Sequence, residues 1–341
     1  IKRAIEIGAG ISLLPEPSRP ELQSGRSYNV LITGIGGTGV VTISALMTMA
    51  AHLEGKVFST IDQFGMAQKG GAVTSHVRLA LAEDDLGAPR LSAGSADLVL
   101  GCDSLVTGGE LALATMDPGR SHVVLNTHQA ITGQFAMNPD LDFPAEDVIG
   151  RIRQEVGEGR LDLVDATRLA TRLLGDSIAS NLFMLGYAYQ KGLVPVTAAA
   201  LERAIELNGL AIAMNKGAFA WGRRAAHDLA AVEALLEAGQ GRAAPESLDS
   251  LIARRAEDLV AYQDAAYAER YRSLVAQVRE AEAALGRGEQ ALSEAVARNL
   301  YKLMAYKDEY EVARLYSDPA WREEMERQLD GAGRLELLLA P

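Results

Sequence analysis

The chain has 341 residues, 48% of them hydrophobic, and a formal net charge of −12 at pH 7. This acidic balance excludes nucleic acid as the main partner, because phosphate binding needs a basic surface. The single cysteine, Cys102, excludes an internal disulfide and an iron–sulfur cluster held by this chain alone, since a cluster takes about four thiolates.

The apolar runs and the ends of the chain indicate the expected location of the protein and whether the chain is a fragment. No apolar run reaches the roughly 18 residues of a membrane span, and no signal-peptide pattern opens the sequence. We therefore expect no membrane partner and a cytoplasmic protein, with which a lone cysteine agrees. The chain starts at Ile1 without a methionine and ends in apolar residues, so we expect a fragment of a longer protein.

The first part of the chain divides into an arm and a domain. Residues 1–27 carry three prolines and three glycines, which predicts a linker or extended arm. From residue 28, short apolar runs alternate with helical patterns. Strands are predicted at 28–34, 56–61, 73–80, 97–101, 122–126 and 162–165. Helices are predicted at 38–53, 144–156, 176–191 and 197–207. This alternation over residues 28–225 predicts an α/β fold with a Rossmann-like, doubly wound, mostly parallel sheet.

The last part of the chain, residues 226–341, is rich in Ala, Glu, Arg and Leu and shows no strand pattern. Apolar side chains recur every three to five residues from Leu259 to Leu285, which predicts one face of a long amphipathic helix. Gly286 and Gly288 predict a turn before a second helix at 289–306. We expect a helical hairpin appended to the α/β domain.

The first candidate ligand-binding segment is Gly34-Ile35-Gly36-Gly37-Thr38-Gly39. It follows a predicted strand and opens a helix, so its glycines would let the backbone approach a phosphate at the positive end of the helix dipole. Asp62 lies 23 residues after Gly39, where a dehydrogenase carries the acid that binds ribose hydroxyls. The alternative is that the glycines serve only tight packing of strand and helix.

The second segment is the loop from Asp62 to Ala72. Loops at the strand ends of open α/β sheets face the ligand crevice. Gln68 and Lys69 supply donors for a phosphate or carboxylate, and Gly70 and Gly71 bring main chain close. The alternative is a solvated loop whose glycines only permit positive φ. The interpretation depends on the two segments meeting at one edge of the sheet.

These two segments resemble the gamma domain of the 2-oxoacid:ferredoxin oxidoreductases. The form with Lys69-Gly70-Gly71, where other branches have Arg-Gly-Gly, resembles the long fused indolepyruvate type. Residues 302–316 resemble that type's appended helical region. Further similar segments lie at 97–103, 181–190, 204–209 and 215–223. The resemblance covers nearly the whole chain from Tyr28 onward.

The resemblance implies an enzyme that decarboxylates an aryl 2-oxo acid such as indolepyruvate, reduces ferredoxin and forms an acyl-coenzyme A. It implies that thiamine diphosphate, Mg²⁺ and [4Fe–4S] clusters belong to other domains, which would be this chain's partners, and that the chain alone is inactive. It implies coenzyme A binding and interdomain packing for the gamma domain. We carry the coenzyme A role to Gly36, Gly37, Thr38, Gln68, Lys69 and Gly70, and we expect a homo-oligomer.

Two other functions stay open, an NAD(P)-dependent dehydrogenase domain and a purely structural assembly module. We assign no catalytic residue and no metal site to this chain. His76 is interpreted as a structural histidine, Cys102 as a small buried residue and Asp103 as a helix cap. Asn181 and Asn215, on apolar helices, are expected to fix contacts between elements.

Overall fold

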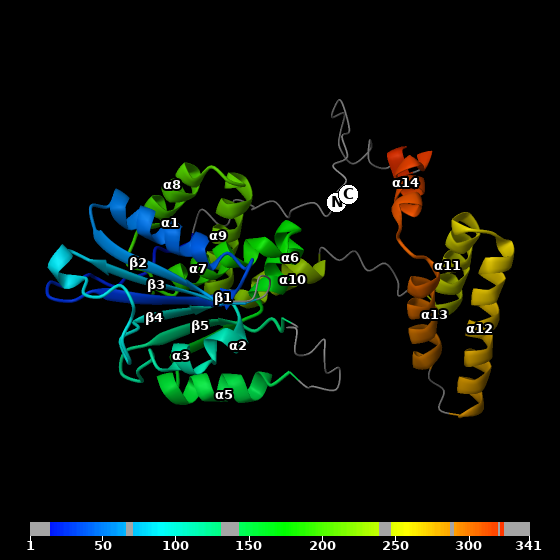
Figure 1. Cartoon of the computed structure of the whole chain (residues 1–341), viewed down its shortest axis with the longest axis horizontal. Coiled ribbons are helices and arrows are strands. Elements are labelled where there is room, and N and C mark those ends of the chain that lie inside the picture. Colours follow the sequence, from blue (N-terminus) through cyan, green and yellow to red (C-terminus); the bar gives the residue numbers. More distant parts are fainter. Residues whose placement is uncertain are drawn as a thin grey trace. The chain divides into compact units, whose positions relative to one another are not determined.

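The computed structural model describes residues 14–65, 71–130, 143–238, 247–286, 290–319 and 321–323. The chain divides into two compact units, Ile1–Gly239 and Gln240–Pro341 (Figure 1). Helix α10 (Leu229–Ala238) belongs to the first unit, because Val232 and Leu236 are buried in its core. The division therefore falls after α10, beyond the change of composition near residue 225.

The first unit is built on a six-stranded sheet with the order β2-β3-β1-β4-β5-β6. The strands are β1 (Tyr28–Ile35), β2 (Val57–Phe64), β3 (Ala72–Ala80), β4 (Leu98–Gly101), β5 (His122–Asn126) and β6 (Leu161–Val164). All six coincide with predicted strands within a few residues. Strands β1, β4, β5 and β6 are parallel neighbours, which confirms the predicted mostly parallel sheet.

Strands β2 and β3 form an antiparallel hairpin, and β3 is also antiparallel to β1. The connection between β2 and β3 spans residues 65–71. A parallel crossover needs about a dozen residues or more, so this short connection permits only a hairpin. As a result Gly65 and Gly71, the described ends of this connection, lie at the edge of the sheet where β1 ends.

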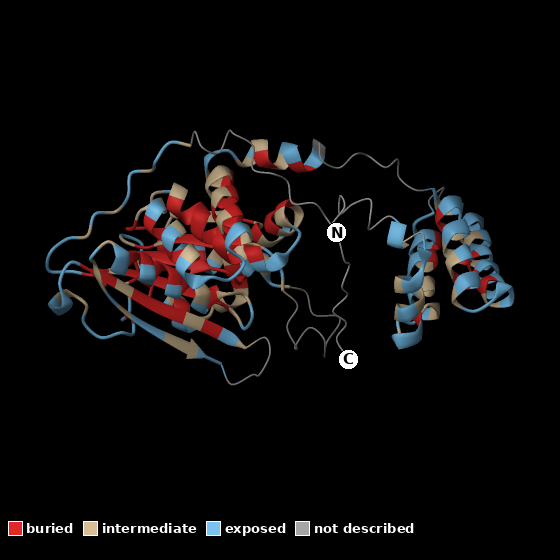
Figure 2. Ribbon diagram, turned by 90° about the horizontal axis from the view of Figure 1, so that it is seen from above, coloured by how far each residue is buried: buried red, intermediate tan, exposed pale blue. Residues whose placement is uncertain are grey.

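Helices cover both faces of the sheet (Figures 1 and 2). One face packs on α1 (Val40–Leu53), α6 (Ala166–Leu174), α7 (Ser180–Gln190), α8 (Ala198–Asn208) and α9 (Ile212–His227). The other face packs on α3 (Glu110–Leu113) and α5 (Ala145–Val156), near the short helix α2 (Ser104–Thr107). Successive residues of β1 point to opposite faces, so Val30 and Ile32 join the first core and Leu31 the second.

Helices α7 and α9 cross in direct backbone contact. A Cβ at Gly186 of α7 would lie 2.0 Å from the carbonyl oxygen of Phe219, and one at Gly222 of α9 would lie 2.0 Å from that of Phe183. Only glycine permits this approach on both helices. The crossing fixes the position of the two helices that reach the end of β1.

The described part of the N-terminal arm lies along α7 and α9. Gln190 Nε2 donates to the carbonyl oxygen of Pro15 at 2.7 Å. Tyr189 Oη and Arg223 Nη2 each donate to the Glu16 carboxylate, at 2.6 and 2.8 Å. The segment has no helix or strand over residues 14–23, as expected for an arm, and these contacts anchor it.

The second unit is helical, with α11 (Leu248–Tyr262), α12 (Ala265–Ala284), α13 (Ala291–Met304) and α14 (Glu309–Ser317). Its core joins Leu251 and Leu259 of α11, Tyr271 and Val275 of α12, and Ala297 of α13. The single long helix expected from Leu259 onward is wrong, because Asp264 begins a new helix by accepting from the Tyr267 amide at 2.7 Å. In the described ranges of both units, no helix is long and apolar enough to cross a membrane.

Candidate functional site at the end of strand β1

The turn between β1 and α1 is held by its own hydrogen bonds. Thr38 N and Oγ1 both donate to the Ile35 carbonyl oxygen, at 3.1 and 2.7 Å. Gly37 and Gly39 have positive φ values of 93° and 76°. Helix α1 begins at Val40 without a side-chain cap. The turn therefore has the strand, glycine and helix order that the sequence predicts.

The glycines of this turn have different roles. A Cβ at Gly34 would lie 2.5 Å from Thr38 Oγ1, and one at Gly39 would lie 2.0 Å from Asn181 Nδ2. Packing therefore explains Gly34, and packing together with its positive φ explains Gly39. No heavy atom of the described residues lies within 4 Å of a Cβ added at Gly37, which is exposed. The described residues therefore leave the turn open at Gly37.

The hairpin loop contacts this turn directly. The Gly36 amide donates to the Gly71 carbonyl oxygen at 2.9 Å. The two glycine-rich segments thus meet at one edge of the sheet. The same hydrogen bond occupies the amide of Gly36, a residue that the sequence analysis assigned to coenzyme A binding. Gln68, Lys69 and Gly70 lie outside the described residues.

Other amides of the turn remain available. Within the described part of the chain, the amides of Gly37, Gly39, Val40 and Val41 have no hydrogen-bond acceptor. The first amides of a helix lack acceptors within the helix, and they point along its positive dipole end. This arrangement is chemically suited to an anion.

A hollow of about 660 Å³ lies beside these amides. We call it the glycine-turn hollow. Its walls come from the β1–α1 turn, the end of β2, and the starts of α7 and α9. They include Gly36, Gly37, Gly39, Val40, Val41, Thr42, Phe64, Ile178, Asn181, Leu210, Ala211, Met214 and Asn215. Most of the wall is apolar, and Phe64 and Leu210 are 68% and 69% exposed.

Two asparagines that the sequence assigned only to internal contacts also line this hollow. Asn181 is 4% exposed and Asn215 is 8% exposed. Asn215 Nδ2 donates to the Leu210 carbonyl oxygen at 2.9 Å, which is such a contact. Asn181 Nδ2 has no acceptor among the described residues and lies against Gly39. The signal in the sequence that could have placed these two asparagines at the hollow was their position on otherwise apolar helices.

Helix α9 also begins at the glycine-turn hollow. Ala211 precedes it with φ 44°, and it is the only non-glycine residue with positive φ in the ranges described. A non-glycine residue in this conformation is uncommon and costs about 1 kcal/mol. No side chain caps α9, so two helix N-termini, those of α1 and α9, border one hollow.

Asp62 does not lie where a dinucleotide-binding acid would. It sits on β2, and β3 separates β2 from β1. The Ser75 hydroxyl donates to its carboxylate. The structure therefore separates Asp62 from the glycine turn, because the hairpin inserts β3 between β2 and β1.

Three other interpretations concern residues near the sheet. Leu91 N donates to His76 Nδ1 at 3.3 Å, so His76 is a buried histidine with partners. Asp103 caps α2 by accepting from the Val106 amide at 2.9 Å. Cys102 is buried, and burial, with Asp103 adding to it, raises the pKa of its thiol to about 12. These residues have structural roles, as predicted.

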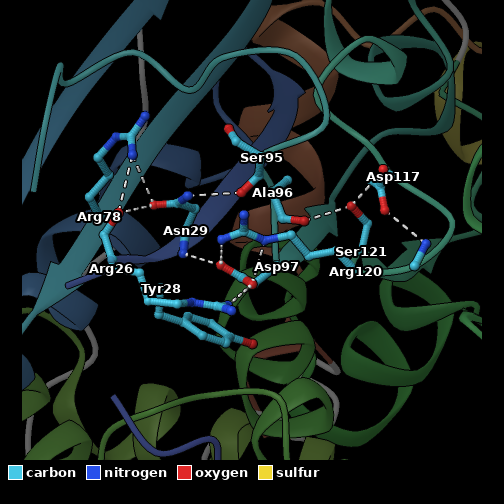
Figure 3. Close-up of polar contacts among 12 residues, drawn as sticks. Arg26, Tyr28, Asn29, Arg78, Ser95, Ala96, Asp97, Asp117, Arg120 and Ser121 are labelled. Atoms are coloured by element: carbon cyan, nitrogen blue, oxygen red, sulfur yellow. Dashed lines mark hydrogen bonds and ion pairs between the residues drawn. The ribbon is translucent and has the colours of Figure 1, made fainter. Parts of the chain in front are cut away.

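A buried ionic cluster lies at the opposite end of β1 (Figure 3). Arg120 forms a two-point ion pair with Asp97, at 2.7 and 2.8 Å, and Arg26 contacts the same carboxylate at 2.9 Å. The Asn29 amide donates to it as well, at 2.8 Å. Asp97 is 7% exposed, so this cluster fixes the start of the sheet and offers little to a ligand. Across the residues that the structure describes, no group of His, Cys, Asp and Glu is arranged for a metal ion.

Comparison with known families defines the class of protein. A model of the pyruvate ferredoxin/flavodoxin oxidoreductase family matches residues 29–225, more than half of the chain, and the chain belongs to this family. Residues 248–341 match a family of unknown function, DUF6537.

Particular relatives are oxidoreductase subunits. The chain is 30% identical over 181 residues to indolepyruvate oxidoreductase subunit IorB of Archaeoglobus fulgidus, covering 52% of this chain and 83% of the subunit. It is 28% identical over 206 residues to the subunit of the same name from Pyrococcus horikoshii, covering 60% and 98%. Pyruvate oxidoreductase subunit PORC of Thermotoga maritima has 20% identity and a TM-score of 0.43, covering 58% of this chain and 96% of PORC.

Proposed function

We propose that this chain is the gamma part of a fused indolepyruvate-type 2-oxoacid:ferredoxin oxidoreductase. In this chain, the glycine-turn hollow and the adjoining β2–β3 hairpin bind coenzyme A. The observation that carries the proposal is the hydrogen bond from Gly36 to Gly71, which joins the two glycine-rich segments beside free helix amides.

The chemistry of the site favours an anion with an apolar body. The amides of Gly37, Gly39 and Val40 suit a phosphate, and Lys69 in the hairpin loop would add a positive charge. The hollow, at about 660 Å³, lies within the usual range of small-molecule sites. Its exposed apolar wall suits the non-phosphate part of coenzyme A.

The rest of the reaction needs other domains. Cys102 is the only cysteine of the chain, so [4Fe–4S] clusters belong elsewhere. We propose that thiamine diphosphate with Mg²⁺ is also bound elsewhere, and that the complete enzyme converts an aryl 2-oxo acid to its acyl-coenzyme A while reducing ferredoxin. The chain alone would be inactive, within a homo-oligomeric cytoplasmic enzyme.

A second candidate is a role in assembly. Phe64 and Leu210 at the glycine-turn hollow are both more than two-thirds exposed. Exposed apolar side chains gathered in one place often mark an interface. They favour packing of this face against a thiamine-binding domain, with or without coenzyme A between them. The position of Asp62, by contrast, argues against the dehydrogenase alternative.

Calorimetric titration separates these functions. We expect the full chain to bind coenzyme A saturably and NAD weakly or not at all. Desulfo-coenzyme A should bind equally well, because the phosphates and not the thiol carry recognition. Tight binding of NAD would support a dehydrogenase, and no binding of either ligand would leave the assembly role.

A further inference from the structure

A second hollow lies on the other face of the sheet, between β3, α3 and the segment before β4. Its volume is about 250 Å³. We call it the α3 hollow. Along β3, Val73 and Val77 face the core beneath α1, so Thr74 and His76 point to the opposite face. The α3 hollow is therefore distinct from the glycine-turn hollow.

The floor and rim of the α3 hollow are apolar. Leu31 of β1 and Leu91 are 1% and 4% exposed and form part of the core under α3. Leu111 of α3 is 73% exposed at the same hollow. An apolar group entering here would cover Leu111 and meet a buried floor, which is favourable by burial of apolar surface.

The polar lining of the α3 hollow includes Gln63, Thr74, His76 and Arg90. His76 Nδ1 accepts from the Leu91 amide at 3.3 Å, so the proton of the neutral ring is on Nε2, 3.3 Å from Gln63 Oε1. Burial lowers the pKa of His76, and nearby Arg90 and Arg78 lower it further. Both effects favour the neutral ring, and with Gln63 Oε1 accepting from Nε2, Gln63 keeps its amide NH₂ for another acceptor. The Thr74 hydroxyl has no partner in the described part of the chain.

Arg90 lines the α3 hollow, Arg78 contacts the Arg90 backbone, and neither guanidinium directly contacts a carboxylate of the described residues. The Arg90 guanidinium forms no hydrogen bond or ion pair with any described residue. Arg78 donates to neutral oxygens only, those of Ser27, Asn29 and the Arg90 carbonyl. In a chain of net charge −12, two neighbouring guanidinium groups with no direct carboxylate contact form a local positive site.

We propose that the α3 hollow binds a small carboxylate with an apolar body. The Arg90 guanidinium takes the carboxylate in its two-point geometry, with Thr74 and Gln63 as further donors. The apolar body lies on Leu31, Leu91 and Leu111. A cavity of about 150 Å³ accommodates benzene, so the α3 hollow has room for one ring and a short acid chain.

The test is titration of phenylacetate into the full chain by calorimetry, with the His76 ring resonances followed by NMR. We expect saturable binding that shifts the His76 resonances. Arg90→Met should weaken it about tenfold, the effect of losing one charge-assisted pair. Thr74→Val should weaken it less. Arg151→Met is the matched control, because Arg151 is another exposed arginine, on α5 and outside the hollow.

Three results would overturn the proposal. The first is no saturable binding at concentrations up to about 10 mM, where even a very weak specific site would fill. The second is equal affinity for phenylacetamide, the neutral isostere, which would remove the role of charge. The third is an unchanged affinity in Arg90→Met with an unchanged melting temperature, which would place the ligand elsewhere.

Discussion

The side-chain amide of Asn181 lies against the backbone of Gly39, so that a Cβ at residue 39 would stand 2.0 Å from Asn181 Nδ2. This contact couples the β1–α1 turn to helix α7. It also places a nearly buried amide at the glycine-turn hollow. The turn is therefore shaped by its neighbour in space as well as by its own sequence.

The first prediction compares two glycines of this turn. Gly39→Ala combines a positive φ with a steric conflict and should lower the free energy of unfolding by about 3 kcal/mol. Gly37→Ala meets no described atom, so its φ of 93° sets the expected loss of about 1 kcal/mol. Urea denaturation measures both. Equal losses would show that Asn181 does not restrict residue 39.

A second prediction concerns the crossing of α7 and α9. Gly186→Ala and Gly222→Ala each force the helices apart and should cost about 3 kcal/mol or more. Gly150→Ala, within α5 and facing open space, should instead stabilise by about 0.5–1 kcal/mol through helix propensity. Thermal unfolding reports all three. A destabilised Gly150→Ala, or a tolerated Gly186→Ala, would contradict the packing described.

The third prediction follows from an ion-pair group at the edge of the sheet. Asp162 accepts from His122 Nε2 and pairs with Lys191 Nζ, both at 2.7 Å. Burial acts to raise the pKa of Asp162, but these two hydrogen bonds outweigh it and hold the pKa below its ordinary value. Because the pKa of Asp162 is lower in the folded state, its ionised carboxylate stabilises the fold at pH values above the ordinary carboxyl pKa of about 4. This contribution is lost as the pH falls below that value.

Asp162→Asn should therefore lower the free energy of unfolding by about 1–2 kcal/mol at pH 7. The difference from the native chain should shrink as the pH falls below about 4. Denaturant titrations at several pH values measure it. A difference that stays constant down to pH 3 would mean that ionisation of Asp162 does not contribute.

The fourth prediction uses the only cysteine. The Cys102 thiol is 8% exposed and its pKa is raised to about 12, first by burial and then by Asp103. Only the thiolate reacts with disulfide reagents. The native chain should react slowly with a chromogenic disulfide at pH 8 and rapidly after denaturation. Fast reaction of the native chain would show that β4 opens at its end.

Much of the fold could be predicted from local sequence. Short apolar or alternating runs predicted all six strands to within a few residues. The insertion of β3 between β1 and β2 was missed because strand order depends on non-local pairing. The short 65–71 connection was the available signal.

The site was predictable in part for the same reason. The glycine turn and the hairpin loop were visible as glycine-rich segments. The hydrogen bond from the Gly36 amide to the Gly71 carbonyl oxygen could not be predicted, because it joins residues far apart in sequence. Asn181, Ala211 and Asn215 also line the glycine-turn hollow, but they lie more than a hundred residues after the glycine turn in the sequence.

The measurement that tests the central claim most directly is the KM for coenzyme A in the complete enzyme carrying Lys69→Ala. The account predicts a rise of about tenfold or more, the loss of one charge-assisted phosphate contact, with a smaller change for the 2-oxo acid. Lys302→Ala, in the helical unit, is the matched control and should leave both KM values unchanged. Equal KM values for coenzyme A in the native enzyme and in Lys69→Ala would contradict a coenzyme A site at the two glycine-rich segments.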